Sequence, residues 1–251
     1  MYQYPQLKKI KQINSNILVY EIYITIAKWK ELLVNPYLRF FYSKKNILYE
    51  LQKENTLHTI KLCEWHRDYL IKDYKFSKKY RHLNLIQHEC YFEYEEDIIH
   101  YLCNDNDDLL PNDINEYNAV LITPKYDDIN NINELSLYIR QIIFCLCHLY
   151  FTHHISFSDI NLENIYVNKN DKIKNIIYNI KNKKHNIKTS KIVKINNFFN
   201  IIENCECLEK LYDNIRIVLK QFQSRYNYDI TNIEKQLNSS ENDFLIFIEN
   251  F

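Results

Sequence analysis

The strongest hydrophobic pattern in this chain lies over residues 132–151. Apolar side chains there cover a broad face of a helix: Leu135, Leu137, Ile139, Ile142, Ile143, Leu146 and Leu149. The pattern predicts a long helix in the core. Its most apolar part, residues 142–151, is short for a membrane span and contains His148, so we expect no segment that crosses a membrane.

The first half of the chain gives weaker patterns. Residues 40–62 predict strands around a polar turn, and residues 63–81 have helical spacing. Two more strands are predicted, one ending near Tyr94 and one over residues 118–123. The apolar stretch within residues 1–35 fits a helix or strands equally well.

The last third of the chain begins with a lysine-rich insertion. Residues 168–191 contain eight Lys and one Asp, residues 192–195 predict a strand, and two or three helical segments follow to Phe251. Strands, one helix, strands and then mostly helices predict an α+β protein with a small β-rich part and a larger helical part. The insertion fits a solvated hairpin better than a nucleic-acid patch, so we do not expect direct nucleic-acid binding.

Composition limits what these patterns can indicate. The chain has 251 residues, of which 46% are hydrophobic, and this is enough for one two-lobed domain with a sizeable core. Glycine is absent, whereas Asn, Lys, Ile and Tyr are abundant, which indicates a strongly AT-rich genome. Lysine and asparagine runs therefore say little about binding, and the formal net charge of zero points to no polyanionic partner.

The cysteines indicate a reducing environment. Seven are present and include two C-x-C pairs, Cys145 with Cys147 and Cys205 with Cys207, whose spacing does not suit a zinc site. We expect mostly structural thiols in an intracellular protein without a signal peptide.

One segment carries a recognisable chemical arrangement. Residues 157–167 read F-S-D-I-N-L-E-N-I-Y-V, so that Asn164 follows Asp159 by five positions and leads into an apolar strand. Asp107 and Asn112 repeat this spacing, but within a polar run that predicts a loop. Residues 157–167 resemble the catalytic loop of eukaryotic protein kinases, H-R-D-L-x-x-x-N. Its Asp takes the substrate hydroxyl proton and its Asn holds a metal ion on the ATP phosphates.

Two further segments resemble kinase motifs in the expected order. The run H-T-I-K ending at Lys61 resembles the V-A-I-K strand, and residues 73–82 resemble the helix whose Glu pairs with that lysine, with Asp73 in its place. A surface lysine and a surface aspartate explain these two residues as well when each is taken alone. V-K-I-N-N-F-F over residues 193–199 resembles the strand that ends in D-F-G, with Asn197 in place of the metal-binding Asp.

Other kinase features are changed or missing. Phe157 and Ser158 replace H-R, and residues 43–51 are the counterpart of a glycine-rich loop that contains no glycine. Side chains there would keep the backbone further from phosphates and weaken ATP binding. Asp213 is predicted either to anchor the catalytic-loop backbone, as a buried helix Asp does in kinases, or to cap its helix.

The segment after Asn164 resembles the haspin family of atypical kinases. About thirty residues separate Asn164 from Asn197, and no A-P-E segment follows. Haspins likewise carry a long hairpin insertion, D-Y-T in place of D-F-G, and no A-P-E. The run Y-N-I-K-N-K … I … V-K-I-N-N-F resembles the haspin run Y-x-L-x-G-K … I … V-x-I-I-D-Y. The kinase resemblance covers roughly residues 40–235, and its haspin-specific part about 160–220.

The resemblance implies a two-lobed protein-kinase-like fold. Its parts would be an extension at residues 1–39, an N-lobe at 40–124, and a C-lobe at 125–251 that contains the hairpin insertion 168–191. The implied function is ATP-dependent phosphorylation of Ser or Thr on a protein, by resemblance the histone H3 tail, in the nucleus or cytoplasm. We expect no membrane partner.

The resemblance also implies roles for individual residues. Asp159, Lys61 and Asp73 would be catalytic. Lys61, Thr123 and Lys125 would contact ATP, and Asn164 and Asn197 would hold Mg²⁺ or Mn²⁺.

Two other interpretations stay open. The chain fits a pseudokinase that serves as a binding or scaffold module, which Asn197, Asp73 and the missing glycines favour and which Asp159 and Lys61 oppose. An unrelated helical protein with chance motifs is the third hypothesis.

Overall fold

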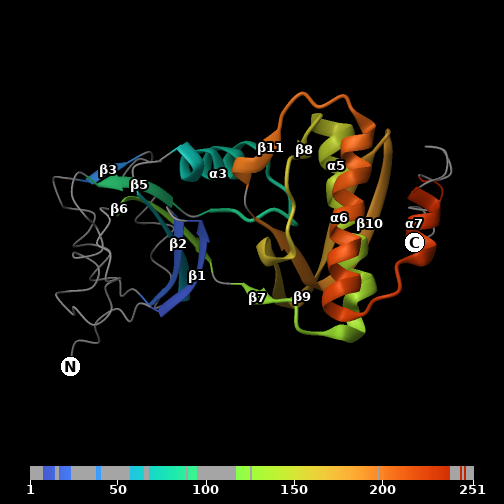
Figure 1. Ribbon diagram of the computed structural model, residues 1–251, viewed down its shortest axis with the longest axis horizontal. Coiled ribbons are helices and arrows are strands. Elements are labelled where there is room, and N and C mark those ends of the chain that lie inside the picture. Colours follow the sequence, from blue (N-terminus) through green and yellow to red (C-terminus); the bar gives the residue numbers. More distant parts are fainter. Residues whose placement is uncertain are drawn as a thin grey trace. The chain divides into compact units, whose positions relative to one another are not determined.

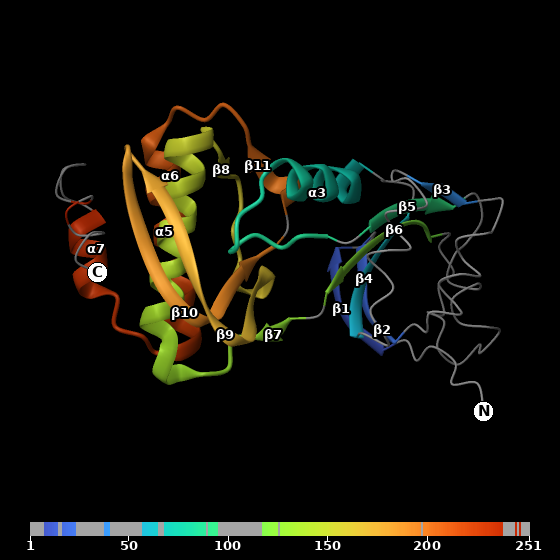
Figure 2. The ribbon, with the colours of Figure 1, turned by 180° about the vertical axis from the view of Figure 1, so that it is seen from behind.

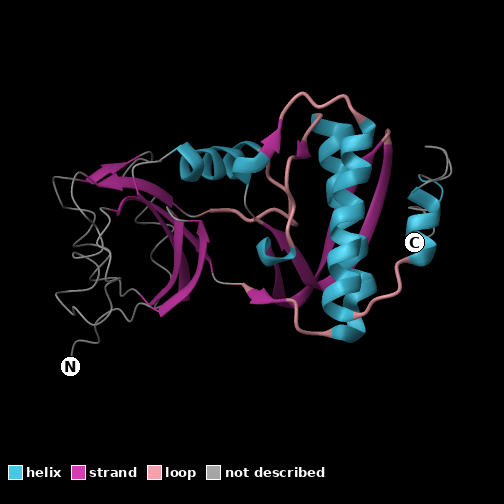
Figure 3. Ribbon diagram, viewed as in Figure 1, coloured by secondary structure: helices cyan, strands magenta, loops and turns pink. Residues whose placement is uncertain are grey.

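The chain is an α+β protein made of two compact units (Figures 1 and 3). The computed structural model describes residues 8–14, 17–23, 38–40, 57–64, 68–88, 90–94, 117–124, 126–196, 198–237, 244 and 246. Unit 1 comprises Met1–Arg81 and Gln87–Lys125, and unit 2 comprises His82–Ile86 and Tyr126–Phe251. The predicted α+β class is confirmed.

Unit 1 is built on a six-stranded sheet in the order β1-β2-β4-β6-β5-β3, in which every neighbouring pair is antiparallel. The strands are β1 (Lys8–Asn14), β2 (Ile17–Tyr23), β3 (Leu38–Phe40), β4 (Leu57–Glu64), β5 (Cys90–Tyr94) and β6 (Tyr117–Pro124). Within the ambiguous residues 1–35, the described segments 8–14 and 17–23 are the strands β1 and β2. The sequence of β1, at the edge of the described sheet, carries three lysines, which are common on edge strands because they discourage further pairing.

Helix α3 (Asp68–Lys79) packs on β5 and β6 of this sheet. Their contact forms a small apolar core of Leu70, Tyr74, Tyr91 and Leu121. The prediction that this helix begins at residue 63 was wrong at its start, because β4 continues to Glu64. Cys63 pairs with β2 on one side and with β6 on the other, and this pairing outweighs the helical spacing of the sequence.

Unit 2 combines a long β-hairpin with helices (Figures 1 and 2). The hairpin strands are β9 (Ile165–Ile180) and β10 (Lys183–Ile195), with β7 (Asp127–Asp128) beside β9, and β8 (Ser156–Phe157) pairs with β11 (Ile201–Ile202). The helices are α5 (Leu135–His153), α6 (Leu208–Tyr226) and α7 (Thr231–Leu237), with 3-10 turns η2 (Ile132–Glu134), η3 (Leu162–Asn164) and η4 (Phe198–Asn200). Helix α5 packs on the hairpin and on α6, and both views show it between them.

Helix α5 is the predicted core helix, and it is buried along most of its length. The expectation that no apolar run is long enough for a membrane span was too strict. By length and mean hydropathy (1.3), Ile132–His153 would suffice. However, 72% of its most apolar window is buried inside the protein, as in the core helix of a globular domain, so this is weak evidence for a span.

The chain forms its left-handed turns without glycine. His154 (φ 54°) ends α5, Asn227 (φ 52°) ends α6, and Lys181 (φ 45°) with Asn182 (φ 65°) forms the hairpin turn. Two successive residues with positive φ are the mark of the tight turn whose twist suits a hairpin, normally made by Asn-Gly. Asparagine tolerates this region better than most residues, so its abundance here has a structural use.

A buried polar network fixes the segment His82–Ile86 to the hairpin. Ile86 N donates to Ile195 O (3.0 Å), and Ile195 N donates to Asn84 O (2.7 Å). The Asn84 amide donates to Gln141 Oε1 (3.0 Å) and to Val193 O (2.8 Å), and it accepts from the Tyr178 hydroxyl (2.7 Å). Asn84, Gln141 and Tyr178 are buried, and both the nitrogen and the oxygen of the Asn84 amide have hydrogen-bond partners. The segment therefore has one well-defined position on unit 2.

Candidate functional site

The candidate site is the loop of residues 157–164, which carries Asp159 and connects β8 to β9. Its entry is fixed by Asn200, the last residue of η4. Ser158 donates through its backbone N (2.7 Å) and through Oγ (2.9 Å) to Asn200 O. Asp159 itself is exposed, so its carboxylate is open to solvent and to a ligand.

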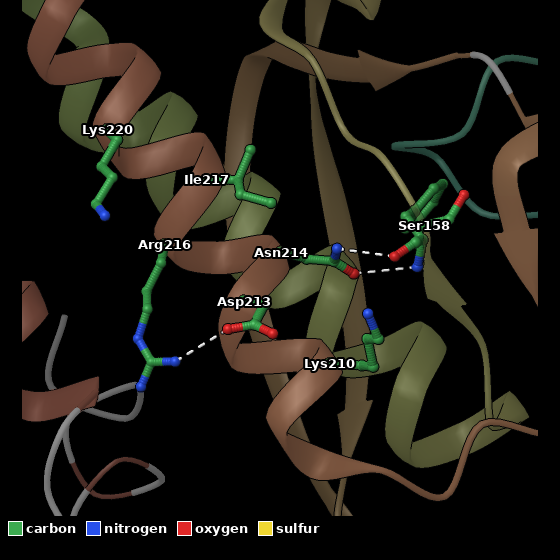
Figure 4. Close-up of a pocket in the computed structure, with 8 residues that line it drawn as sticks. Ser158, Lys210, Asp213, Asn214, Arg216, Ile217 and Lys220 are labelled. Atoms are coloured by element: carbon green, nitrogen blue, oxygen red, sulfur yellow. Dashed lines mark hydrogen bonds and ion pairs between the residues drawn. The ribbon is translucent and has the colours of Figure 1, made fainter.

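Asn214 of α6 holds the beginning of this loop (Figure 4). Its side chain is 2% exposed. Oδ1 accepts from Phe157 N (3.0 Å) and from Ser156 Oγ (2.8 Å), while Nδ2 donates to Phe157 O (2.9 Å). One amide therefore satisfies both backbone polar groups of Phe157, two positions before Asp159.

Gln221 of the same helix holds the other side of the loop. Its Oε1 accepts from Leu162 N (2.7 Å), and its Nε2 donates to Ile160 O (3.2 Å). Gln221 follows Asn214 by seven residues, or about two helical turns, so both amides lie on one face of α6. We call this pair the amide clamp. It fixes the backbone on either side of Asp159.

The sequence predicted an anchor from α6 but named the wrong residue. Asp213 neither binds the loop nor caps the helix, since it is the sixth residue of α6 and its half-exposed carboxylate accepts from Arg216 (3.2 Å). Asn214 was missed because the family resemblance asks for an acid there. Its position relative to the buried Leu211 and Val218 would have shown that it faces inward.

Asn164 lies beside the end of β10. Asn196 N donates to Asn164 O (2.9 Å), so the residue before Asn197 is tied to the end of the loop that carries Asp159. Asn164 is partly buried. Asn197 lies outside the described residues.

The other predicted site residues belong to unit 1. Lys61 lies in β4, in register with Leu121 of β6, and Asp73 is fully buried on α3. Burial on this scale requires cationic or hydrogen-bonding partners for a carboxylate, so Asp73 is not a solvated surface residue. Thr123 is also buried, with Oγ1 2.8 Å from His88 Nδ1. Lys125 lies outside the described residues.

The donor atoms around the loop fit a magnesium ion only in part. The described residues contain no group of three or more His, Cys, Asp or Glu that could hold a metal. Asp159 offers one carboxylate and Asn164 one amide oxygen. Within the described part of the chain, the buried Asn196 Oδ1 accepts no hydrogen bond, so it is a further free oxygen near Asn164. Mg²⁺ accepts such a set when phosphates complete its coordination, but prefers charged oxygens.

Among the ionisable groups of unit 2, Lys194 and His82 have pKa values well below their ordinary values. Lys194 is buried, donates to Leu83 O (2.6 Å) and lies over the Tyr126 ring, and burial lowers its pKa to about 8. Burial also lowers the pKa of His82 to about 4, against the opposing effect of its hydrogen bond to Ile177 O (3.0 Å). Sequence reasoning missed Lys194, whose signal was a single lysine within the apolar strand 192–195.

Four of the seven cysteines can be assigned as free thiols in the described part of the chain. Cys145, Cys147, Cys205 and Cys207 are free thiols, and all but Cys207 are buried. Burial raises the pKa of Cys145 and Cys147 far above the ordinary value of a thiol, so neither is a nucleophile near neutral pH.

Comparison with known proteins identifies no family. No protein-family model matches the chain, and no curated protein matches it. Any assignment of function therefore rests on the residues and contacts described above.

Proposed function

We propose that this protein is a diverged haspin-like protein kinase that transfers a phosphoryl group from ATP to Ser or Thr of a protein substrate. The observation that carries the proposal is the contact between Asn164 O and Asn196 N at 2.9 Å. It joins the end of the loop of Asp159 to the strand end that resembles D-F-G. The contact continues the antiparallel pairing of β9 with β10, in which Ile165 faces Ile195, so this hairpin brings the two kinase-like segments together.

The amide clamp supports the same proposal. Phosphoryl transfer depends mainly on positioning and on neutralising charge, so a catalytic carboxylate needs a fixed backbone. Asn214 and Gln221 supply this for Asp159 from both sides. In this role Asp159 would accept the proton of the substrate hydroxyl, and its exposure leaves room for that hydroxyl.

In the proposed site, Lys61 contacts the ATP phosphates and Asp73 pairs with Lys61. The complete burial of Asp73 favours its use as the partner of a lysine, as the resemblance requires. Asn164, with Asn197, would hold the divalent cation, which when bound would neutralise charge on the phosphates. With an amide at Asn197 the cation lacks one charged ligand, so we expect weak metal binding and a low rate.

The test is the thermal stability of the whole chain with ATP and Mg²⁺ or Mn²⁺. A site whose dissociation constant is about ten times below the nucleotide concentration adds about 1.4 kcal/mol, or a rise in Tm of about 3–6 °C. Lys61→Ala should abolish the rise, while Lys75→Ala, an exposed lysine of α3, should keep it. Absence of any shift in the wild type at millimolar nucleotide would refute the proposal.

A scaffold without catalysis is the second candidate, and the neutral Asn197 is the residue that favours it. Phosphate transfer to a Ser- or Thr-containing protein separates the two. Asp159→Asn should keep the metal-dependent rise in Tm and lose the transfer if the protein is a kinase. A rise in Tm without any transfer by the wild type would favour the scaffold.

A further inference from the structure

A basic pocket is lined by residues of α6 and by Phe157 and Ser158, at the start of the loop that carries Asp159 (Figure 4). Its volume is about 230 Å³. The lining residues are Phe157, Ser158, Lys210, Asp213, Asn214, Arg216, Ile217 and Lys220. Four of the α6 members, Lys210, Asp213, Ile217 and Lys220, recur every three or four positions and so share one face of the helix, next to the strand that leads into Asp159.

Two of the lining cations are available to a ligand. Arg216 is already engaged by Glu209 (2.6 Å) and Asp213 (3.2 Å). Among the described residues, neither Lys210 nor Lys220 forms an ion pair, and Lys220 is exposed. The one acidic residue in the lining, Asp213, is balanced by Arg216, so the charge that remains in the pocket is positive.

The other polar groups in the pocket do not compete for an anion. The Asn214 amide is occupied by Ser156 and Phe157, and the Ser158 hydroxyl donates to Asn200 O. The volume is below the roughly 300–1,000 Å³ of pockets that enclose drug-sized ligands. It suits one anionic side chain better than a nucleotide.

We propose that this pocket binds an anionic side chain of the protein substrate, a phosphorylated residue or a carboxylate, within a few residues of the hydroxyl that reacts. This inference rests on the proposed kinase function, since the loop of Asp159 defines where the substrate lies. Lys210 and Lys220 select for negative charge by attraction. The preferred substrate is then an acidic or already phosphorylated segment, unlike the basic histone tail that the family resemblance implies.

Binding of short peptides in the absence of nucleotide tests the inference separately from catalysis. Three fluorescein-labelled peptides with one central Ser differ at a neighbouring position, which is phosphoserine, Asp or Ala, and fluorescence anisotropy gives their affinities. We expect the phosphoserine peptide to bind at least tenfold more tightly than the Ala peptide at low salt. The Asp peptide shows whether a carboxylate suffices.

The double variant Lys210→Ala/Lys220→Ala should remove this preference. The matched control Lys172→Ala/Lys188→Ala removes two exposed lysines of the hairpin and should keep it. Equal binding of the phosphoserine and Ala peptides to the wild type would overturn the inference, as would a preference that survives the pocket variant. The peptide assay contains no nucleotide, so its result is independent of the ATP-dependent rise in Tm. Failure of the pocket proposal can therefore be told apart from failure of the proposed kinase function.

Discussion

Replacement of Asn214 by alanine should release the loop of Asp159. The variant removes three hydrogen bonds of 2.8–3.0 Å and leaves Phe157 N, Phe157 O and the Ser156 hydroxyl without the partner that α6 supplies. Each buried backbone group left unsatisfied costs about 1–3 kcal/mol. The two groups of Phe157 together give a local loss of about 4 kcal/mol, which corresponds to a roughly thousandfold increase in opening of this segment.

Hydrogen exchange of the Phe157 amide is the suitable assay, because it reports on unit 2 alone. Unfolding of a chain with two compact units need not be a single transition, so a global midpoint would average over both. We expect the exchange protection of this amide to fall by about three orders of magnitude in Asn214→Ala. The matched control is Gln223→Ala, which removes an exposed side chain from the same helix. It should change the exchange protection of the Phe157 amide by less than tenfold.

The opposite result would refute the reasoning. Protection in Asn214→Ala within tenfold of the wild type would mean that the amide clamp does not determine the position of the loop. An equal loss in Asn214→Ala and Gln223→Ala would mean that α6 is destabilised as a whole and that the contacts of Asn214 have no special part.

Two further predictions concern other parts of unit 2. The pKa of His82 is about 4 when folded and 6.5 ordinarily, so the unfolded chain binds the proton more tightly and stability falls as pH drops through this window, by at most about 3 kcal/mol. His82→Gln should flatten the fall of the unfolding midpoint between pH 6.5 and 4, and an unchanged slope would contradict this. Asn182→Gly should stabilise the hairpin by about 0.5 kcal/mol, because the position has φ 65°, whereas Lys184→Gly within β10 should destabilise it by about 1 kcal/mol. The unfolding midpoints of the two variants test this prediction. If Asn182→Gly and Lys184→Gly shifted the midpoint in the same direction, the prediction would be contradicted.

The sequence predicted those parts of the fold in which local pattern and burial agree. Helix α5 was predictable because its apolar side chains repeat through five turns, and the hairpin was predictable from its place after the catalytic-loop-like segment. The start of α3 was not, because pairing of Cys63 on both sides keeps that residue in β4. The strands in residues 1–35 were ambiguous, since an edge strand such as β1 carries lysines instead of a clean alternation.

The candidate site shows a different limit. Spacing located the loop of Asp159, but it could not show that Asn164 meets Asn196, because that contact depends on the register of β9 with β10. Asp213 was considered as the anchor on α6 because the kinase resemblance calls for an acid there. Adjacent residues of a helix point about 100° apart, so a shift of one position exchanges a solvent-facing acid for the buried amide of Asn214.

At two positions of this site, Asn214 and Asn197, an amide stands where the kinase resemblance calls for an acid. The effect on binding differs between the two positions. At Asn214 the loop presents both an N–H and a C=O of Phe157, and an amide serves both, whereas a carboxylate would only accept. At Asn197 the expected partner is a divalent cation, and there the loss of charge weakens binding. A well-held loop is therefore compatible with an enzyme and with a scaffold, because the clamp needs no charge. Phosphate transfer to a protein substrate separates the two, since it requires a bound divalent cation and therefore depends on the second asparagine.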